Sequence, residues 1–234
     1  MELMIPRQQL SAEDDQCHLV VGTYALFLQL FLGFAAFLTL FYKRALEEPP
    51  RPWLVWFFDS SKQGFGALLV HFWNIGLSVW ISMVGDAFEG AKDECALYFL
   101  NFTLDVVVGT FLIWLLLRGQ RWLALRWDIA ALQRTGDYGK PPSVRVYLAQ
   151  LVTYLLILLA VKTALAVAVV AALPVLRGAV TALFAPIRQY PDVELTVVMI
   201  VCPWMMNTCQ FWVLDNVLSH KRVTVNGYDK IEEF

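Results

Sequence analysis

Residues 146–173 read VYLAQLVTYLLILLAVKTALAVAVVAAL, and Lys162 is the one charged side chain in this stretch. An α-helix rises about 1.5 Å per residue and the hydrocarbon layer of a bilayer is about 30 Å thick, so about 20 apolar residues cross it. The stretch therefore predicts a transmembrane helix with polar or charged groups inside it.

Stretches of similar length and composition occur at four further places in the chain. The predicted spans are 19–42, 63–84, 95–117, 146–173 and 195–218. The composition agrees, because 59% of the residues are hydrophobic and only 16% are charged. We expect an all-α polytopic membrane protein with five transmembrane helices in a single domain, 19–218, between a short N-terminus, 1–18, and a short tail, 219–234.

The basic residues predict the orientation of these spans. Of 18 Lys and Arg, 13 lie in the connections after the first and third spans, including Lys62 at the start of the second, and in the tail. Because Lys and Arg accumulate on the cytosolic side, we expect a non-cytosolic N-terminus and a cytosolic C-terminus. Acidic residues at 13–15 and the long apolar run that follows favour a first span that is retained rather than cleaved.

The cysteines divide between the two faces in this topology. Cys17 precedes the first span and Cys95 opens the third, both at the oxidising, non-cytosolic face, which suggests a disulfide between them. Cys202 and Cys209 lie within the last span and are read as small packing residues. No further Cys or His stands at ligand spacing, so we expect no metal site.

Two opposite charges lie at matching depth within the spans. Asp105 is ten residues into the third span and Lys162 eleven residues from the corresponding end of the fourth, which places both about 15 Å deep. Because an isolated charge in hydrocarbon is costly, we expect a buried ion pair, with Asn101 as a further hydrogen-bonding group. Such a pair either fixes helix register or takes part in ion or proton movement.

The last span is polar along its cytosolic half. It contains Asn207, Gln210 and Asp215, and Pro203 predicts a kink. This face, together with Asn101, either lines a polar cavity or bonds to neighbouring helices.

Two segments border the predicted spans on the cytosolic side. Residues 52–62 extend the second span beyond one bilayer thickness, so we expect an interfacial helix, with the motif Trp56, Asp59, Lys62 and Gln63 at the cytosolic mouth. The amphipathic segment 122–132 predicts a helix that lies on the membrane or continues the third span and ends at the glycines and prolines of 135–142.

Several motifs resemble one known family. They are Arg-Pro-Trp at 51–53, WFFDSSKQG at 56–64, YFLNF at 98–102, Leu-Asp at 104–105, GDYG at 136–139 and FWVLDN at 211–216. In this order they resemble the STIMATE family of multi-pass endoplasmic-reticulum proteins, whose members are similar to vacuolar membrane proteins of fungi and plants. The resemblance implies a regulator that associates with STIM-type calcium sensors at junctions with the plasma membrane and promotes store-operated calcium entry, acting on Orai channels indirectly. It also implies a lumenal N-terminus.

Three classes of function follow from these features. A membrane adaptor, in contact with the lipid bilayer and a STIM-type partner, is the main expectation. The alternative is a small ion or solute transporter or channel that uses Asp105, Lys162 and Asp215. An enzyme acting on lipid would need Asp59, His71 and Asp215 together. The chain carries no recognisable catalytic motif, cofactor motif or nucleic-acid-binding array, so we expect no enzyme, no cofactor and no nucleic-acid partner.

Overall fold

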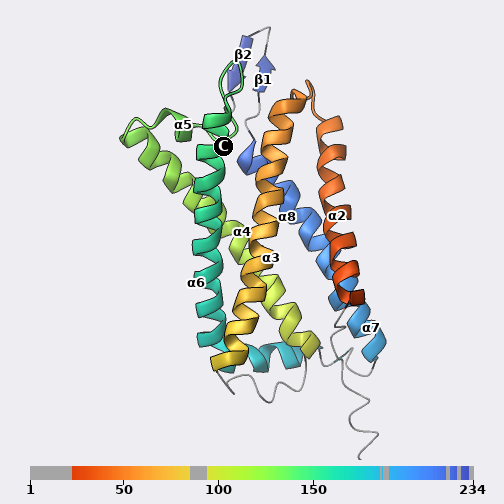
Figure 1. The fold of residues 1–234 in the computed structure, drawn as a ribbon. Coiled ribbons are helices and arrows are strands. Elements are labelled where there is room, and N and C mark those ends of the chain that lie inside the picture. The colour runs from red at the N-terminus through yellow and green to blue at the C-terminus, as the bar shows by residue number, and fades with distance from the viewer. Residues whose placement is uncertain are drawn as a thin grey trace, which may run out of the picture.

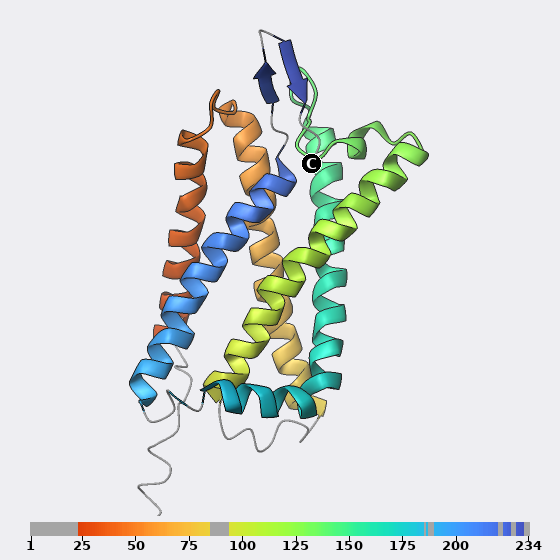
Figure 2. The same ribbon diagram turned by 180° about the vertical axis from the view of Figure 1, so that it is seen from behind.

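The computed structural model describes residues 23–84, 94–184, 186, 190–219, 222–225 and 228–231, which form a bundle of long helices (Figures 1 and 2). The long helices are α2 (Thr23–Ala45), α3 (Trp53–Val84), α4 (Glu94–Arg126), α6 (Val144–Phe184) and α8 (Cys202–Leu218). The shorter elements are α5 (Ala130–Gln133), α7 (Pro191–Thr196), the π-helix η2 (Val197–Val201), and strands β1 (Arg222–Val225) and β2 (Tyr228–Ile231). We call the end where α2 stops, α3 starts and β1–β2 lies the tail end of the bundle; it is at the top of Figure 1.

Four helical stretches among the described residues are long and apolar enough to cross a membrane. They are Phe27–Ala45, Tyr98–Arg126, Val144–Val169 and Val193–Leu218. The fold class is confirmed in this coarser form, as a multi-pass helical membrane protein. The second predicted span, 63–84, lies within α3, which is not among the four, so the count of five spans stays a prediction.

The segment before the second span does not form a separate helix, and its position at the membrane interface stays a prediction. Trp53–Val84 is one continuous helix of 32 residues, about 48 Å long at 1.5 Å per residue. Its polar first turns do not need to leave the bundle, because Asp59, Lys62 and Gln63 are buried against other parts of the chain. Asp59 and Lys62 find their hydrogen-bond and ion-pair partners within the protein, in side chains and in the Leu218 carbonyl.

The first part of the amphipathic segment 122–132, up to Arg126, continues the third span. α4 runs to Arg126 as one helix, and α5 follows after a break at Asp128, whose φ of 53° is left-handed. Trp122 and Trp127 are 65% and 67% exposed near the tail end, where α4 diverges from α6 (Figure 2). Of the two alternatives, the structure therefore has a continuation of the preceding helix as far as Arg126, and a separate short helix, α5, after the break.

The last span forms without interruption. α7, η2 and α8 follow one another directly, and the π-helix Val197–Val201 comes immediately before the buried Pro203. A proline lacks the N–H that would bond to the preceding turn, and a wider π turn accommodates that loss. The helix type thus changes locally just before Pro203, and the kink itself stays a prediction. After α8, β1 and β2 pair in antiparallel fashion, an element not expected from the sequence.

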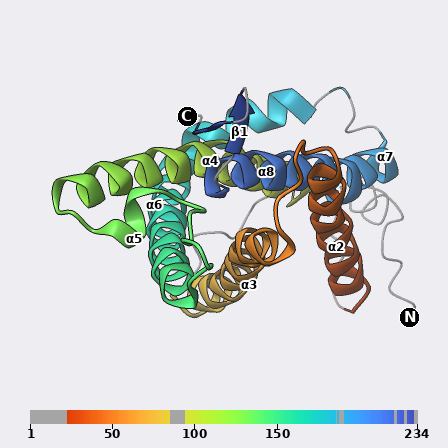
Figure 3. The same ribbon diagram turned by 90° about the horizontal axis from the view of Figure 1, so that it is seen from above.

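The long helices pack in two main pairs, and α8 of one pair also contacts α4 of the other. α4 lies against α6 and α2 against α8, and the view from above shows α8 between α2 and α4 (Figure 3). One core cluster joins α4, α6 and α8; its members include Ile113, Leu117, Tyr154, Leu158 and Leu214. This core holds the tail-end segments of three helices at fixed distances, which positions the polar groups described next.

Candidate functional site

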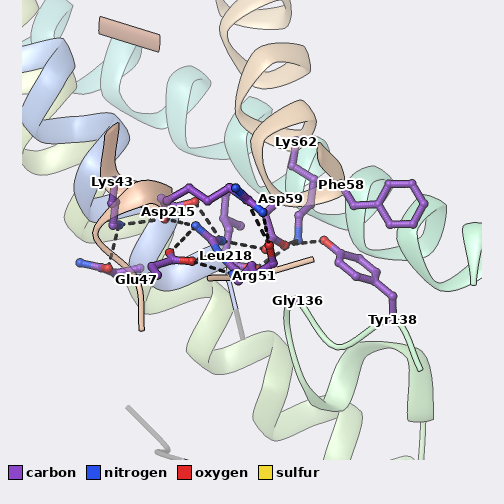
Figure 4. A network of polar contacts seen from close by, with 12 residues as sticks. Lys43, Glu47, Arg51, Phe58, Asp59, Lys62, Gly136, Tyr138, Asp215 and Leu218 are labelled. Carbon is purple, nitrogen blue, oxygen red and sulfur yellow. Dashed lines mark hydrogen bonds and ion pairs between the residues drawn. The ribbon is translucent and has the colours of Figure 1, made fainter. Parts of the chain in front are cut away.

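A network of charged and polar side chains is buried at the tail end of the bundle (Figure 4). We call it the polar network; it consists of Lys43, Glu47, Arg51, Asp59, Lys62, Tyr138, Gln150 and Asp215. Its three basic and three acidic residues balance in formal charge. The members come from α2, α3, α6, α8 and two connections, so the network joins segments that are far apart in the sequence.

Arg51 is the centre of the network. Its Nη1 donates to Asp59 Oδ2 at 2.9 Å and its Nη2 to Asp215 Oδ2 at 2.9 Å, while Nη2 also lies 2.7 Å from Glu47 Oε1. Burial alone would lower the pKa of Arg51, but Asp215, Glu47 and Asp59 together raise that pKa above its ordinary value. The planar guanidinium can bridge three carboxylates at once because its donors point in fixed, different directions.

Asp215 receives a second cation from α2. Lys43 Nζ lies 2.9 Å from Asp215 Oδ2 and also donates to Trp212 O and to Asn216 Oδ1, both at 2.8 Å. Asp215 has no exposed surface. Its carboxylate thus neutralises Lys43 and shares the Arg51 guanidinium with Asp59. This arrangement ties the end of α2 to the end of α8.

Lys62 occupies the opposite side of the network and is fully buried. Its Nζ donates to Gln150 Oε1 at 3.3 Å and to Leu218 O at 3.2 Å, and lies 3.6 Å from Asp59 Oδ1. The Tyr138 ring adds a cation–π contact, with Nζ 5.2 Å from the ring centre. Lys62 therefore links α3 to α6 and to the last carbonyl of α8.

The connection between α5 and α6 closes the network from outside. Gly136 and Gly139 have φ of 80° and 81°, a left-handed backbone that favours glycine. Gln150 accepts from Gly136 N at 2.9 Å, and its Nε2 donates to the carbonyl of Ala131 in α5 and to two carbonyls of the connection, those of Arg134 and Asp137. This bracing places Tyr138, 2% exposed, so that its hydroxyl donates to Asp59 Oδ1 at 2.7 Å.

The Tyr138 hydroxyl is held in its neutral form. Burial and the neighbouring Asp59 carboxylate raise the pKa of Tyr138 well above its ordinary value. A neutral phenol can donate to the carboxylate, whereas a phenolate would repel it. With every charge of the network compensated by an opposite charge, the site has the character of a clamp on four helices rather than of an open binding surface.

The second polar region is a cavity of about 620 Å³ inside the bundle. Its wall contains the ion pair between Lys162 Nζ on α6 and Asp105 Oδ2 on α4. Six amide side chains share the wall; they are Gln29, Gln63, Asn74, Asn101, Asn207 and Gln210. The structure thus brings Asn101, Asn207 and Gln210 together with Asp105 and Lys162, along one polar cavity.

Other predicted site residues lie elsewhere. Asp215 does not line this cavity but belongs to the polar network, and it shares Arg51 with Asp59. His71 lines the cavity, whereas Asp59 and Asp215 do not, so the three side chains that a lipid-modifying enzyme would need are not gathered in it. Trp56 is 5% exposed and packs against Phe41 of α2.

The cysteine predictions are only partly within the described residues. Cys17 and the side chain of Cys95 lie outside them. Cys202 and Cys209 are free thiols. Within the described part of the chain, no three His, Cys, Asp or Glu side chains are grouped as ligands of a metal ion would be.

Sequence reasoning missed most of the network. Lys43 and Arg51 were counted as topology signals, although both neutralise buried carboxylates. Arg51 and Tyr138 stood in the family motifs at 51–53 and 136–139, which is the signal that could have found them. Nothing in the sequence singles out Gln150, one polar residue in a long apolar helix.

Comparison with known proteins agrees with the motifs. The family model described as the STIMATE family matches residues 95–220, more than half of the chain, which confirms the resemblance. A vacuolar membrane protein of Saccharomyces cerevisiae is 26% identical, in an alignment covering 93% of this chain and 85% of the yeast protein. No solved structure matches the chain. The matched region includes the 136–139 connection, most of α4 and all of α6 and α8.

Proposed function

Because the chain belongs to the STIMATE family, we propose that it is a membrane adaptor that promotes store-operated calcium entry by associating with STIM-type calcium sensors. Orai channels respond to it indirectly, through the sensor. The family match is the observation that carries this proposal. An adaptor needs a rigid cytosolic surface, and the polar network supports such a role because it clamps the connections at the tail end.

The proposal assigns the tail end of the bundle to the cytosol and the N-terminus to the lumen of the endoplasmic reticulum. The uneven distribution of Lys and Arg supports this orientation. Since the yeast relative is named as a vacuolar membrane protein, the organelle needs its own test. Epitope tags at the two ends, probed before and after the plasma membrane alone is permeabilised, should show only the C-terminal tag accessible, in an endoplasmic-reticulum pattern.

Calcium recordings test the adaptor itself. In cells lacking the protein, calcium entry after store depletion should fall and should recover when the wild-type chain is expressed again. A labelling enzyme fused to the C-terminus should biotinylate a STIM-type sensor after store depletion, more strongly than the same enzyme on an unrelated membrane protein of that organelle. Unchanged entry without labelling of the sensor would remove the proposal.

Transport of an ion or small solute is a second candidate, and the polar cavity around Asp105 and Lys162 favours it. Transport would require the polar network to open, because Asp59 and Lys62 are fully buried. Proteoliposomes with a trapped pH-sensitive dye provide the direct test. A proton flux that depends on the protein and disappears in the charge-free double variant Asp105→Asn with Lys162→Met, reconstituted at an equal amount of monodisperse protein, would support this candidate.

A further inference from the structure

The cavity contains a polar group that the polar network does not use. Gln63 is 1% exposed and lines the cavity on α3, one residue after Lys62. Within the described residues, neither its Nε2 nor its Oε1 has a hydrogen-bond partner. A buried amide without partners is costly, so a molecule that both accepts from Nε2 and donates to Oε1 would stabilise this site.

The charges of the cavity wall limit what that molecule can be. Asp105 and Lys162 neutralise each other, and no other Asp, Glu, Lys or Arg belongs to the wall. A charged headgroup would have to break this ion pair or remain uncompensated in a medium of low dielectric constant, and either is unfavourable. Amide side chains, in contrast, bond equally well to uncharged hydroxyl and amide groups.

The surroundings of the cavity indicate the route of entry. At the tail end, the buried Asp59 and Lys62 of the polar network lie beside Gln63. On α2 and α3, which both contribute to the wall, large apolar side chains are exposed, among them Phe27 at 69%, Phe31 at 67% and Phe72 at 63%. Such faces lie against hydrocarbon in a membrane protein, so the adjacent bilayer is the nearest reservoir of ligand.

We propose that the cavity binds a neutral membrane amphiphile, a lipid whose headgroup carries hydroxyl or amide groups without net charge, and that the Gln63 amide holds this headgroup. Diacylglycerols and ceramides are lipids of this class. The apolar part of the wall, which includes Leu32, Val106 and Leu158, receives the start of the hydrocarbon chains. A volume of about 620 Å³ is within the range of ligand cavities.

Photo-crosslinking tests this site in the full-length protein. The protein is placed in phosphatidylcholine nanodiscs with a photoreactive diacylglycerol, and crosslinked peptides are located by mass spectrometry. We expect labelled peptides from the cavity-lining parts of α3 and α8, with unlabelled diacylglycerol competing. Gln63→Leu should reduce this labelling about fivefold to tenfold, as the loss of one or two hydrogen bonds predicts.

Two further variants separate binding from folding. Gln120→Leu is the matched control, since Gln120 also has a buried oxygen without a partner but lines a different, apolar groove between α4 and α6, so labelling should not change. Ala67→Phe places a ring in the cavity and leaves Gln63 intact; it decides the question if Gln63→Leu does not fold, and it should also reduce labelling.

Several results would overturn the proposal. These are equal labelling of the same peptides by a photoreactive phosphatidylserine, labelling that neither Gln63→Leu nor Ala67→Phe changes, or no labelling of the cavity. Competition by free glycerol at equal concentration would assign the site to a water-soluble solute and favour transport instead. None of these outcomes depends on calcium entry, so this inference and the adaptor proposal fail separately.

Discussion

Arg51 and Asp215 stand 164 residues apart in the sequence, yet Arg51 Nη2 donates to Asp215 Oδ2 at 2.9 Å in the interior of the protein. The contact joins the connection after α2 to the last turn of α8. Because Asp59 on α3 shares the same guanidinium, one side chain sets the relative positions of three segments.

Asp215→Asn should destabilise the protein strongly. The change removes the carboxylate that neutralises Lys43 and shares Arg51, and breaking a buried ion pair costs about 3 to 5 kcal/mol. Thermal unfolding in detergent should show a lower midpoint than the wild type. Glu48→Gln is the matched control, because Glu48 is an exposed acidic residue in the connection that carries Arg51. Equal midpoints for Asp215→Asn and Glu48→Gln would contradict the assigned role.

Tyr138 and Asp59 should behave as a coupled pair. Their 2.7 Å hydrogen bond joins the 134–142 connection to α3, so Tyr138→Phe and Asp59→Asn remove one interaction between them. A double-mutant cycle on the free energy of unfolding should give a coupling of about 0.5 to 3 kcal/mol. The pair Tyr147→Phe and Asp59→Asn is the comparison, since the Tyr147 hydroxyl bonds to Ser61 rather than to Asp59. Additive effects for Tyr138 would show that the bond does not form in solution.

The raised pKa of Tyr138 predicts an alkaline dependence of stability. An ordinary tyrosine has a pKa of about 10, so the unfolded chain loses its phenol proton there while the folded protein keeps it. The stabilisation is complete below that pH and is lost as the pH rises further. Between about pH 9 and 11, the unfolding midpoint of the wild type should fall more steeply than that of Tyr138→Phe. Parallel curves would mean that Tyr138 is not buried against the carboxylate.

The ion pair between Asp105 and Lys162 should respond differently to single and double changes. Asp105→Asn leaves Lys162 without its counter-ion inside the bundle, at a cost of at least about 2.5 kcal/mol. The double variant Asp105→Asn with Lys162→Met removes both charges and should recover most of the lost yield of monodisperse protein. An equal yield of monodisperse protein from the double variant and from Asp105→Asn alone would indicate that these two residues do more than neutralise each other.

Gly139→Ala should destabilise the connection that carries Tyr138. Gly139 has a φ of 81°, where an added Cβ costs about 1 to 2 kcal/mol. Gly119→Ala is the control, because Gly119 is helical with open space around it, and alanine there should stabilise by up to about 1 kcal/mol. The two substitutions should change the free energy of unfolding in opposite directions. A neutral Gly139→Ala would mean that the connection can adopt another conformation.

Much of the fold could be predicted because hydropathy acts locally. The span in α6 was evident from the run at 146–173, and opposite charges at equal depth predicted that Asp105 and Lys162 would meet. The continuity of α3 could not be predicted in this way. Asp59 and Lys62 look like groups that need water, and only the neighbouring helices supply their partners.

The sequence by itself determined that lipid surrounds long helices, since the cost of leaving backbone groups or charges in hydrocarbon depends on composition and length alone. Tertiary structure alone decided the partners of each polar group. The sequence predicts Asp215 on one polar face with Asn207 and Gln210, but Asp215 bonds to Arg51 and Lys43 while the two amides line the cavity. Electrostatic pairing depends on distances between residues far apart in the chain, and packing of the helices sets those distances.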